Sequence, residues 1–135
     1  AYEIKDILLP EIQKETADFI CLNFANPDMV GHTGNLEAAI RACEVVDECL
    51  DLIVNESLKK NYVSIVLSDH GNCEKMLNRD GSTNTDHTTN PVPIILVDEK
   101  KRKISNGILA DIAPTILDIM GIKLPKEMNG KSLLK

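Results

Sequence analysis

The chain has 135 residues, which suits one compact domain or part of a larger one. Hydrophobic residues make up 43% of it and aromatic residues only 3%, so the core must be aliphatic. The net charge of −6 argues against nucleic-acid or anionic-membrane partners, and no apolar run approaches the roughly 20 residues of a membrane span.

Cysteine usage predicts a reducing compartment, and we expect a cytoplasmic protein. The four cysteines contain no Cys-x-x-Cys pair, so a structural zinc site is not expected. Cys21 lies in an apolar run and Cys43 on a helical apolar stripe, and both are expected to be buried. Cys73 lies close to an Asp-His pair and is expected to be a loop thiol with no chemical task.

The first elements alternate between apolar runs and polar segments. Residues 1–14 predict an amphipathic helix that Pro10 kinks or divides. Residues 18–25 form a nearly continuous apolar run, typical of a strand buried on both faces in a parallel sheet. The proline and glycines of residues 26–35 then predict irregular backbone.

A long helix and a second strand are expected next. Residues 36–60 place apolar side chains at helical spacing, with Asn35 as the expected N-cap and Asn61 at the left-handed C-terminal position. The β-branched run of residues 63–68 predicts a buried strand. Strand, helix and strand in this order predict a βαβ unit with parallel strands.

The second half begins with a long polar segment, residues 71–91, and such segments in compact domains are usually functional. Residues 93–98 predict a third strand. Asp111 is expected to cap a helix that ends at Gly121. The fold class predicted from these elements is α/β, with a mainly parallel sheet flanked by helices.

All three histidines fall in polar segments that follow predicted strands. Asp28 precedes His32 by four residues, Asp69 is adjacent to His70, and His87 lies in the long polar segment. Carboxylate and imidazole ligands without a thiolate suit Mn²⁺ or Zn²⁺, and suit Ca²⁺ or Mg²⁺ less well. Five such ligands are generous for one ion and sparse for two, so we expect two metals with some ligands missing.

Two further points concern the chemistry. Adjacent residues on a regular strand point to opposite faces, so Asp69 and His70 could serve two neighbouring centres. The chain contains no glycine-rich phosphate loop and no nucleophile-elbow motif. The residues alone therefore predict the core of a metal-dependent hydrolase or transferase without an identifiable nucleophile.

Several blocks of sequence resemble the cofactor-independent phosphoglycerate mutases. The longest is Asn23-Phe24-Ala25-Asn26-Pro27-Asp28-Met29-Val30-Gly31-His32-Thr33-Gly34. The others are residues 67–72, 85–88, 111–115 and 128–133. The Asp-His-Gly block alone is similar to the wider alkaline phosphatase superfamily, whereas the first block is specific.

The resemblance implies a phosphatase-like α/β domain and the interconversion of 3-phosphoglycerate and 2-phosphoglycerate through a phosphoserine. It implies two Mn²⁺ ions, with Zn, Co or Mg as possible replacements. Asp28, His32 and His87 would hold one ion, and Asp69 and His70 would share the other. An aspartate and the nucleophilic serine, both nearer the family's amino terminus, would complete the second set.

The chain is far shorter than the full-length enzymes of this family. Residues 1–135 would then be the carboxyl-terminal segment of the phosphatase-like metal-binding domain, with no catalytic nucleophile, unknown substrate-binding residues and no activity alone. The expected partners are phosphoglycerate and the rest of a parent chain, without nucleic acid or membrane. Two alternatives are a phosphopentomutase or phosphatase of the same superfamily, and a non-catalytic metal-binding module.

Overall fold

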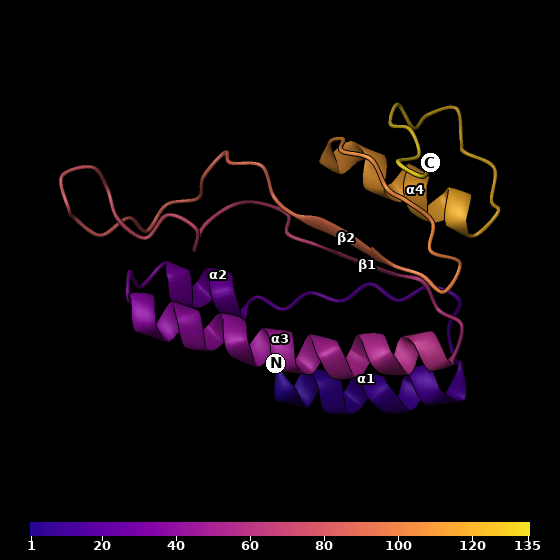
Figure 1. The fold of residues 1–135 in the computed structure, drawn as a ribbon, viewed down its shortest axis with the longest axis horizontal. Coiled ribbons are helices and arrows are strands. Elements are labelled where there is room, and N and C mark those ends of the chain that lie inside the picture. Colours follow the sequence, from indigo (N-terminus) through magenta and orange to yellow (C-terminus); the bar gives the residue numbers. More distant parts are fainter.

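The computed structural model describes residues 1–135 and shows a layer of helices beneath a two-stranded ribbon, with a small carboxyl-terminal unit beside it (Figure 1). No helix is long and apolar enough to span a bilayer. The elements are α1 (Tyr2–Lys14), α2 (Asn26–Gly31), α3 (Leu36–Lys59), β1 (Ser64–Leu67), β2 (Ile94–Val97), the 3₁₀ turn η1 (Leu109–Asp111) and α4 (Ile112–Ile119).

The predicted long helix is confirmed as α3. Its N-cap is Asn35, whose side-chain oxygen accepts a hydrogen bond from the Ala38 backbone N–H at 3.0 Å. Helix α1 packs along the second half of α3 and runs in the same direction (Figure 1). Tyr2 donates to Glu48 at 2.7 Å near the start of this contact, and a Lys60–Glu15 ion pair lies at its end.

The two strands pair with each other and run antiparallel. Ser64 lies opposite Val97, and Leu67 lies opposite Ile94. The chain is therefore α/β, but the predicted mainly parallel sheet is absent from it. Residues 18–25, predicted as a strand, form no ladder, because a strand needs a hydrogen-bonded partner and this segment has none within the chain.

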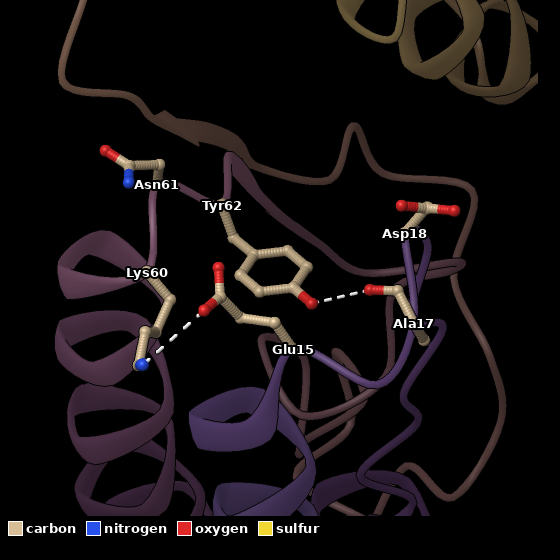
Figure 2. A pocket seen from close by; sticks show the side chains of 6 residues that line it. All are labelled: Glu15, Ala17, Asp18, Lys60, Asn61 and Tyr62. Atoms are coloured by element: carbon tan, nitrogen blue, oxygen red, sulfur yellow. Dashed lines mark hydrogen bonds and ion pairs between the residues drawn. The ribbon is translucent and has the colours of Figure 1, made fainter.

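The segment of residues 17–28 nevertheless follows the same course as residues 62–73. At one end the Tyr62 hydroxyl donates to the Ala17 carbonyl at 2.5 Å, and at the other the Cys73 thiol donates to the Pro27 carbonyl at 3.0 Å. The direction expected of a βαβ unit is therefore present. The Tyr62 bond lies beside a pocket of about 250 Å³, with Glu15, Asp18, Lys60 and Asn61 also in its lining (Figure 2).

Three local expectations need correction. Helix α1 continues through Pro10, so of the two alternatives, a kink or a division, the division is wrong. Residues 26–31, expected to be irregular, form α2, because Pro27 in the first turn lacks only an N–H that would have no helical partner. Asp111 precedes α4, but its carboxylate accepts hydrogen bonds from the Ile108 and Lys131 backbone N–H groups and caps no N–H of α4.

The cysteine expectations also differ from the structure. Cys21 and Cys43 are exposed, whereas Cys49 is completely buried. Cys49 points from α3 into the contact with α1 where Ile12 is also buried, while the helix face that carries Cys43 is open. An apolar stripe on a helix is buried only where another element covers it.

Candidate metal centre

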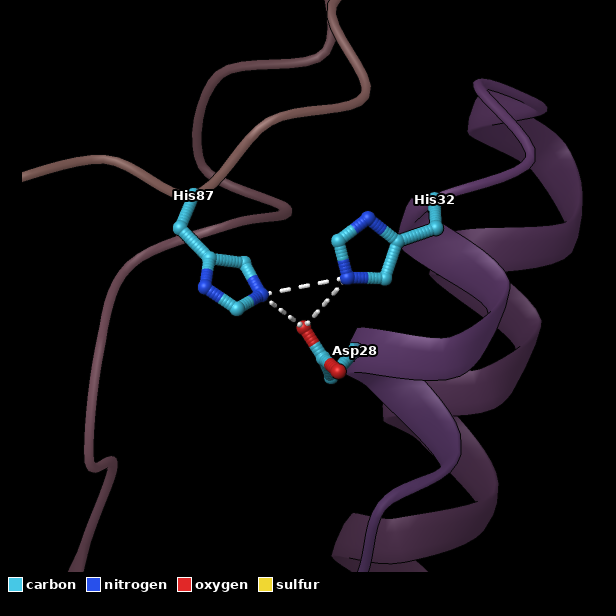
Figure 3. A group of neighbouring side chains, drawn as sticks. All are labelled: Asp28, His32 and His87. Carbon is cyan, nitrogen blue, oxygen red and sulfur yellow. Dashed lines mark hydrogen bonds and ion pairs between the residues drawn. The ribbon is translucent and has the colours of Figure 1, made fainter.

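Asp28, His32 and His87 converge on one point (Figure 3). The His32 and His87 Nε2 atoms are 3.1 Å apart. The Asp28 Oδ1 atom lies 3.1 Å from the His87 Nε2 atom and 3.3 Å from the His32 Nε2 atom. The three residues are separated by up to 59 positions in the chain, so only the tertiary fold brings them together.

Two different elements supply these side chains. Asp28 and His32 are four residues apart on or next to the short helix α2, so both project from one face of it. His87 comes from the polar segment of residues 71–91. An isolated antiparallel bridge between Gly71 and Thr88, with the Thr88 N–H donating to the Gly71 carbonyl at 2.8 Å, closes this segment beside α2.

The ring of His32 is held in one tautomer. Its Nδ1 atom lies 2.6 Å from the Thr85 carbonyl oxygen, which can only accept a hydrogen bond. The Nδ1 atom therefore carries the proton, and in the neutral ring the Nε2 atom presents a lone pair towards Asp28 and His87. Metal-binding histidines usually have such a second bond, which fixes ring orientation and raises ligand basicity.

Asp28 has its own orienting partner, Asn72. The Asn72 side-chain amide donates to the Asp28 Oδ1 atom at 3.0 Å, and Asn72 is only 7% exposed. Gly31 makes room for it, because a Cβ atom at Gly31 would overlap the Asn72 side chain. Asn72 lies within the block of residues 67–72 that resembles the mutases, but its role depends on the contact with Asp28, which no local pattern of residues predicts.

Asp69 and His70 lie beside this group. The His70 Nε2 atom is 3.6 Å from the Asp69 Oδ1 atom and 3.9 Å from the Asp28 Oδ1 atom. Strand β1 ends at Leu67, so the alternation of a regular strand does not extend to these two residues. Their side chains therefore approach each other instead of pointing to opposite faces.

Glu74 stabilises the segment that carries His87, a role that the sequence did not indicate. Its carboxylate accepts hydrogen bonds from the Thr88 hydroxyl and, at 2.9 Å, from the Asn90 amide. These two hydrogen bonds hold the pKa of Glu74 below its usual range, and the bond from Thr88 has the larger effect. Glu74 therefore stays ionised near neutral pH and keeps the end of the polar segment in place.

The geometry of the triad fits a metal ion. An ion about 2.0–2.2 Å from each ligand keeps neighbouring ligand atoms about 3–3.5 Å apart. The observed separations are 3.1, 3.1 and 3.3 Å. Without a cation or proton between them, the lone pairs of the His32 Nε2 and Asp28 Oδ1 atoms would repel each other. The side chains of all three residues are 31–48% exposed, which leaves a coordination position open towards solvent.

Comparisons with known proteins agree with a metal cofactor. The family model described as the Metalloenzyme superfamily matches residues 1–124. A 2,3-bisphosphoglycerate-independent phosphoglycerate mutase of Flavobacterium psychrophilum is 60% identical over 134 residues, and that of Symbiobacterium thermophilum is 50% identical over 137 residues. These alignments cover 99% of this chain but only 26% of each relative.

A solved structure is similar over the same length. The phosphoglycerate mutase of Leishmania mexicana, determined at low cobalt concentration, superposes with a TM-score of 0.87 and 28% identity. The superposition covers 99% of this chain and 28% of that one. On the family match over residues 1–124, the chain belongs to the Metalloenzyme superfamily.

Proposed function

We propose that this chain is the carboxyl-terminal segment of the phosphatase-like domain of a cofactor-independent phosphoglycerate mutase. The parent protein would interconvert 3-phosphoglycerate and 2-phosphoglycerate through a phosphoserine, with the serine outside this chain. One observation carries the proposal: Asp28, His32 and His87 present three ligand atoms within 3.3 Å of one another. The names of the relatives, at 50–60% identity, support the choice of reaction.

This arrangement supports two ligand sets. Asp28, His32 and His87 would hold one Mn²⁺ ion, while Asp69 and His70 would contribute to a second. Residues elsewhere in the parent chain would complete the second set. Bound metals offset charge on phosphoryl oxygens and lower the pKa of an attacking hydroxyl. Mn²⁺ suits mixed carboxylate and imidazole ligands, and Zn, Co or Mg are possible replacements.

The remaining residues of the centre prepare these ligands. The Thr85 carbonyl keeps the proton of His32 on the Nδ1 atom and leaves the Nε2 atom free to coordinate. Asn72 holds the Asp28 carboxylate towards the histidines. Glu74 fixes the segment on which His87 lies. Preorganisation of this kind lowers the cost of assembling the site when metal and substrate bind.

The rest of the parent chain would be the main partner of this domain. Phe19 and Ile95 are each 54% exposed, on the extended segment and on β2. We propose that residues 18–25 join a parallel sheet when further strands of the parent protein lie beside them. The expected substrate is phosphoglycerate, the expected compartment is the cytoplasm, and no nucleic acid or membrane is expected as a partner.

An assay of the whole parent protein tests the proposal. With Mn²⁺, the protein should convert 3-phosphoglycerate to 2-phosphoglycerate, and chelation should abolish this activity. Ribose phosphates serve as the control substrates, because a phosphopentomutase would use them instead. The 135-residue chain alone should show no turnover, since it lacks the nucleophile. Failure with phosphoglycerate under metal-replete conditions would contradict the proposed function.

A further inference from the structure

The polar segment that carries His87 folds back on itself as a hairpin, from Gly71 to Thr88. This hairpin extends beyond the end of the two-stranded ribbon (Figure 1). One antiparallel bridge joins Gly71 to Thr88 at its base, and a second joins Leu77 to Thr83 near its tip. His87 lies on the returning half, directly before the bridge at the base. The position of His87 therefore depends on what holds the two halves together between these bridges.

Asn84 lies between the two bridges and is only 7% exposed. Its side-chain amide donates to the Lys75 carbonyl on the outgoing half at 2.9 Å and to the Asp86 carbonyl on its own half at 3.2 Å. Its backbone N–H donates to the Met76 carbonyl at 3.0 Å. An amide group has two N–H donors and a carbonyl oxygen can only accept, so each of the two side-chain bonds takes one N–H of Asn84.

These bonds hold the two peptide groups on which the histidines of the triad depend. The Asp86 carbonyl belongs to the peptide group that leads into His87. Because a peptide group is planar and includes both flanking Cα atoms, the bond from Asn84 restricts where the His87 Cα atom lies. The preceding peptide group contains the Thr85 carbonyl, which accepts from the Nδ1 atom of His32 at 2.6 Å. The Thr85 carbonyl thus lies between the two points that Asn84 anchors, its own backbone and the Asp86 carbonyl.

The hairpin also contacts the turn that follows His32. Gly34, two residues after His32, has a φ angle of 69°, and a Cβ atom there would overlap the side chain of Thr83. Thr83 directly precedes Asn84. The hairpin is therefore packed against the turn between α2 and α3 at the point where Asn84 begins to shape its returning half.

We propose that Asn84 is a positioning residue of the metal centre that holds both of its histidines. The inference rests on the metal centre of the proposed function and adds a residue to it. Asn84 offers no ligand atom itself. It acts through the Asp86 carbonyl on His87 and through the Thr85 carbonyl on His32. Without its amide, the two rings have to be ordered when the ion binds, which lowers the affinity for the metal.

Calorimetric titration of the whole parent protein with Mn²⁺ tests this role. Asn84→Ala removes both N–H donors, and we expect the Mn²⁺ affinity to fall by about 10–100-fold. Asn84→Asp is the second variant, because a carboxylate has the size of the amide but no N–H to donate. It keeps the buried space filled and should lose affinity to a similar extent. Circular dichroism establishes that each variant is folded before the titration.

Asn78→Ala is the matched control. The Asn78 amide donates to the Ser82 hydroxyl at 3.1 Å and to the Thr83 carbonyl at 3.3 Å, so it ties the tip of the same hairpin without reaching the peptide groups next to His87. Its Mn²⁺ affinity should stay within a factor of about two of that of the unsubstituted protein, below the loss expected of an orienting residue. A role of Asn84 in hairpin stability alone would instead make the Asn78 and Asn84 variants alike.

The visible absorption of protein saturated with Co²⁺ provides a second readout, because it reports the geometry of the coordinating atoms. We expect this spectrum to change in Asn84→Ala and to remain unchanged in Asn78→Ala. The inference is overturned if Asn84→Ala keeps the affinity or the Co²⁺ spectrum of the unsubstituted protein, or if Asn78→Ala loses as much affinity. Absence of metal binding by the unsubstituted protein would overturn the metal centre as well. None of these measurements uses the mutase assay, so a different reaction of the parent protein would leave the role of Asn84 intact.

Discussion

The imidazole rings of His70 and His87 stack on each other, with their centroids 3.8 Å apart and their planes inclined by 20°. His87 belongs to the triad with Asp28 and His32, whereas His70 is paired with Asp69. The stack and the distance of 3.9 Å from the His70 Nε2 atom to the Asp28 Oδ1 atom place the two candidate ligand sets side by side. Two ions held by these sets would act on a single phosphoryl group.

Removing a triad ligand should weaken metal binding more than removing any orienting residue. His87→Gln deletes one of the three converging atoms, and we expect Mn²⁺ affinity of the parent protein to fall by more than about 100-fold, which exceeds the loss expected on removing a residue that only orients a ligand. Calorimetric titration with Mn²⁺ measures this change. Asp86→Asn is the matched control, since Asp86 is the exposed neighbour of His87. The Mn²⁺ affinity of this variant should stay within a factor of about two of that of the unsubstituted protein. Equal losses in both variants would contradict the assignment.

Asn72→Ala should weaken metal binding without removing a ligand. The substitution deletes the amide that donates to the Asp28 Oδ1 atom at 3.0 Å, so the carboxylate is less well oriented. Loss of a residue that orients a metal ligand costs about 10–100-fold in metal affinity. The same titration serves as the measurement, with Asn55→Ala as control because Asn55 bonds only to Asp51 on the exposed face of α3. An unchanged affinity in Asn72→Ala would show that Asn72 does not position the ligand.

Sequence reasoning succeeded where the determining signals are local. Helix α3 was predicted within one residue at its end, because Asn35 and the apolar spacing act within a few residues of each other. The strand expected at residues 18–25 failed because hydrogen-bonded partners decide strand formation, and no sequence pattern within the segment supplies them.

The candidate site shows the same division. Asp28, His32 and His87 could be selected from the sequence because titratable residues gathered in polar segments after apolar runs. Asn72 could not, since a neutral amide gains its role only through its contact with Asp28. The tautomer of His32 likewise depends on the Thr85 backbone carbonyl, which any residue type at that position could offer.

Tyr62→Phe should destabilise the protein by loosening the extended segment. The Tyr62 hydroxyl donates to the Ala17 carbonyl in a partly buried position, and such a bond contributes about 0.5–1.5 kcal/mol to the free energy of unfolding. Denaturant unfolding measures the loss. Tyr2→Phe is the control, because the bond from Tyr2 to Glu48 is exposed and should contribute less. If both variants lose the same free energy of unfolding, the hydrogen bond from Tyr62 to Ala17 stabilises the protein no more than an exposed one does.

Asp111→Asn should destabilise the carboxyl-terminal unit in a pH-dependent way. Hydrogen bonds from the backbone N–H groups of Lys131 and Ile108 hold the pKa of the Asp111 carboxyl below its usual value of about 3.9, and the bond from Lys131 has the larger effect. A lowered pKa in the folded state stabilises the protein above the unfolded-state pKa, and this contribution is lost as the pH falls through the folded-state pKa. The Tm of the variant should therefore lie furthest below that of the unsubstituted protein near neutral pH, and the difference should shrink below about pH 4.

The control for this prediction is Asp118→Asn, because Asp118 is an exposed carboxylate on α4, the helix that follows Asp111. Its Tm should match that of the unsubstituted protein across the same pH range. A deficit in Asp111→Asn that stays constant from neutral to acidic pH would show that the two backbone N–H bonds do not depend on the charge of Asp111.

The most direct test is the anomalous difference map of crystals of the parent protein grown with Mn²⁺. We expect one peak about 2 Å from the Asp28 carboxylate and from the Nε2 atoms of His32 and His87, and a second beside Asp69 and His70. A fully loaded crystal with its manganese peaks elsewhere, and with none between Asp28, His32 and His87, would contradict the account.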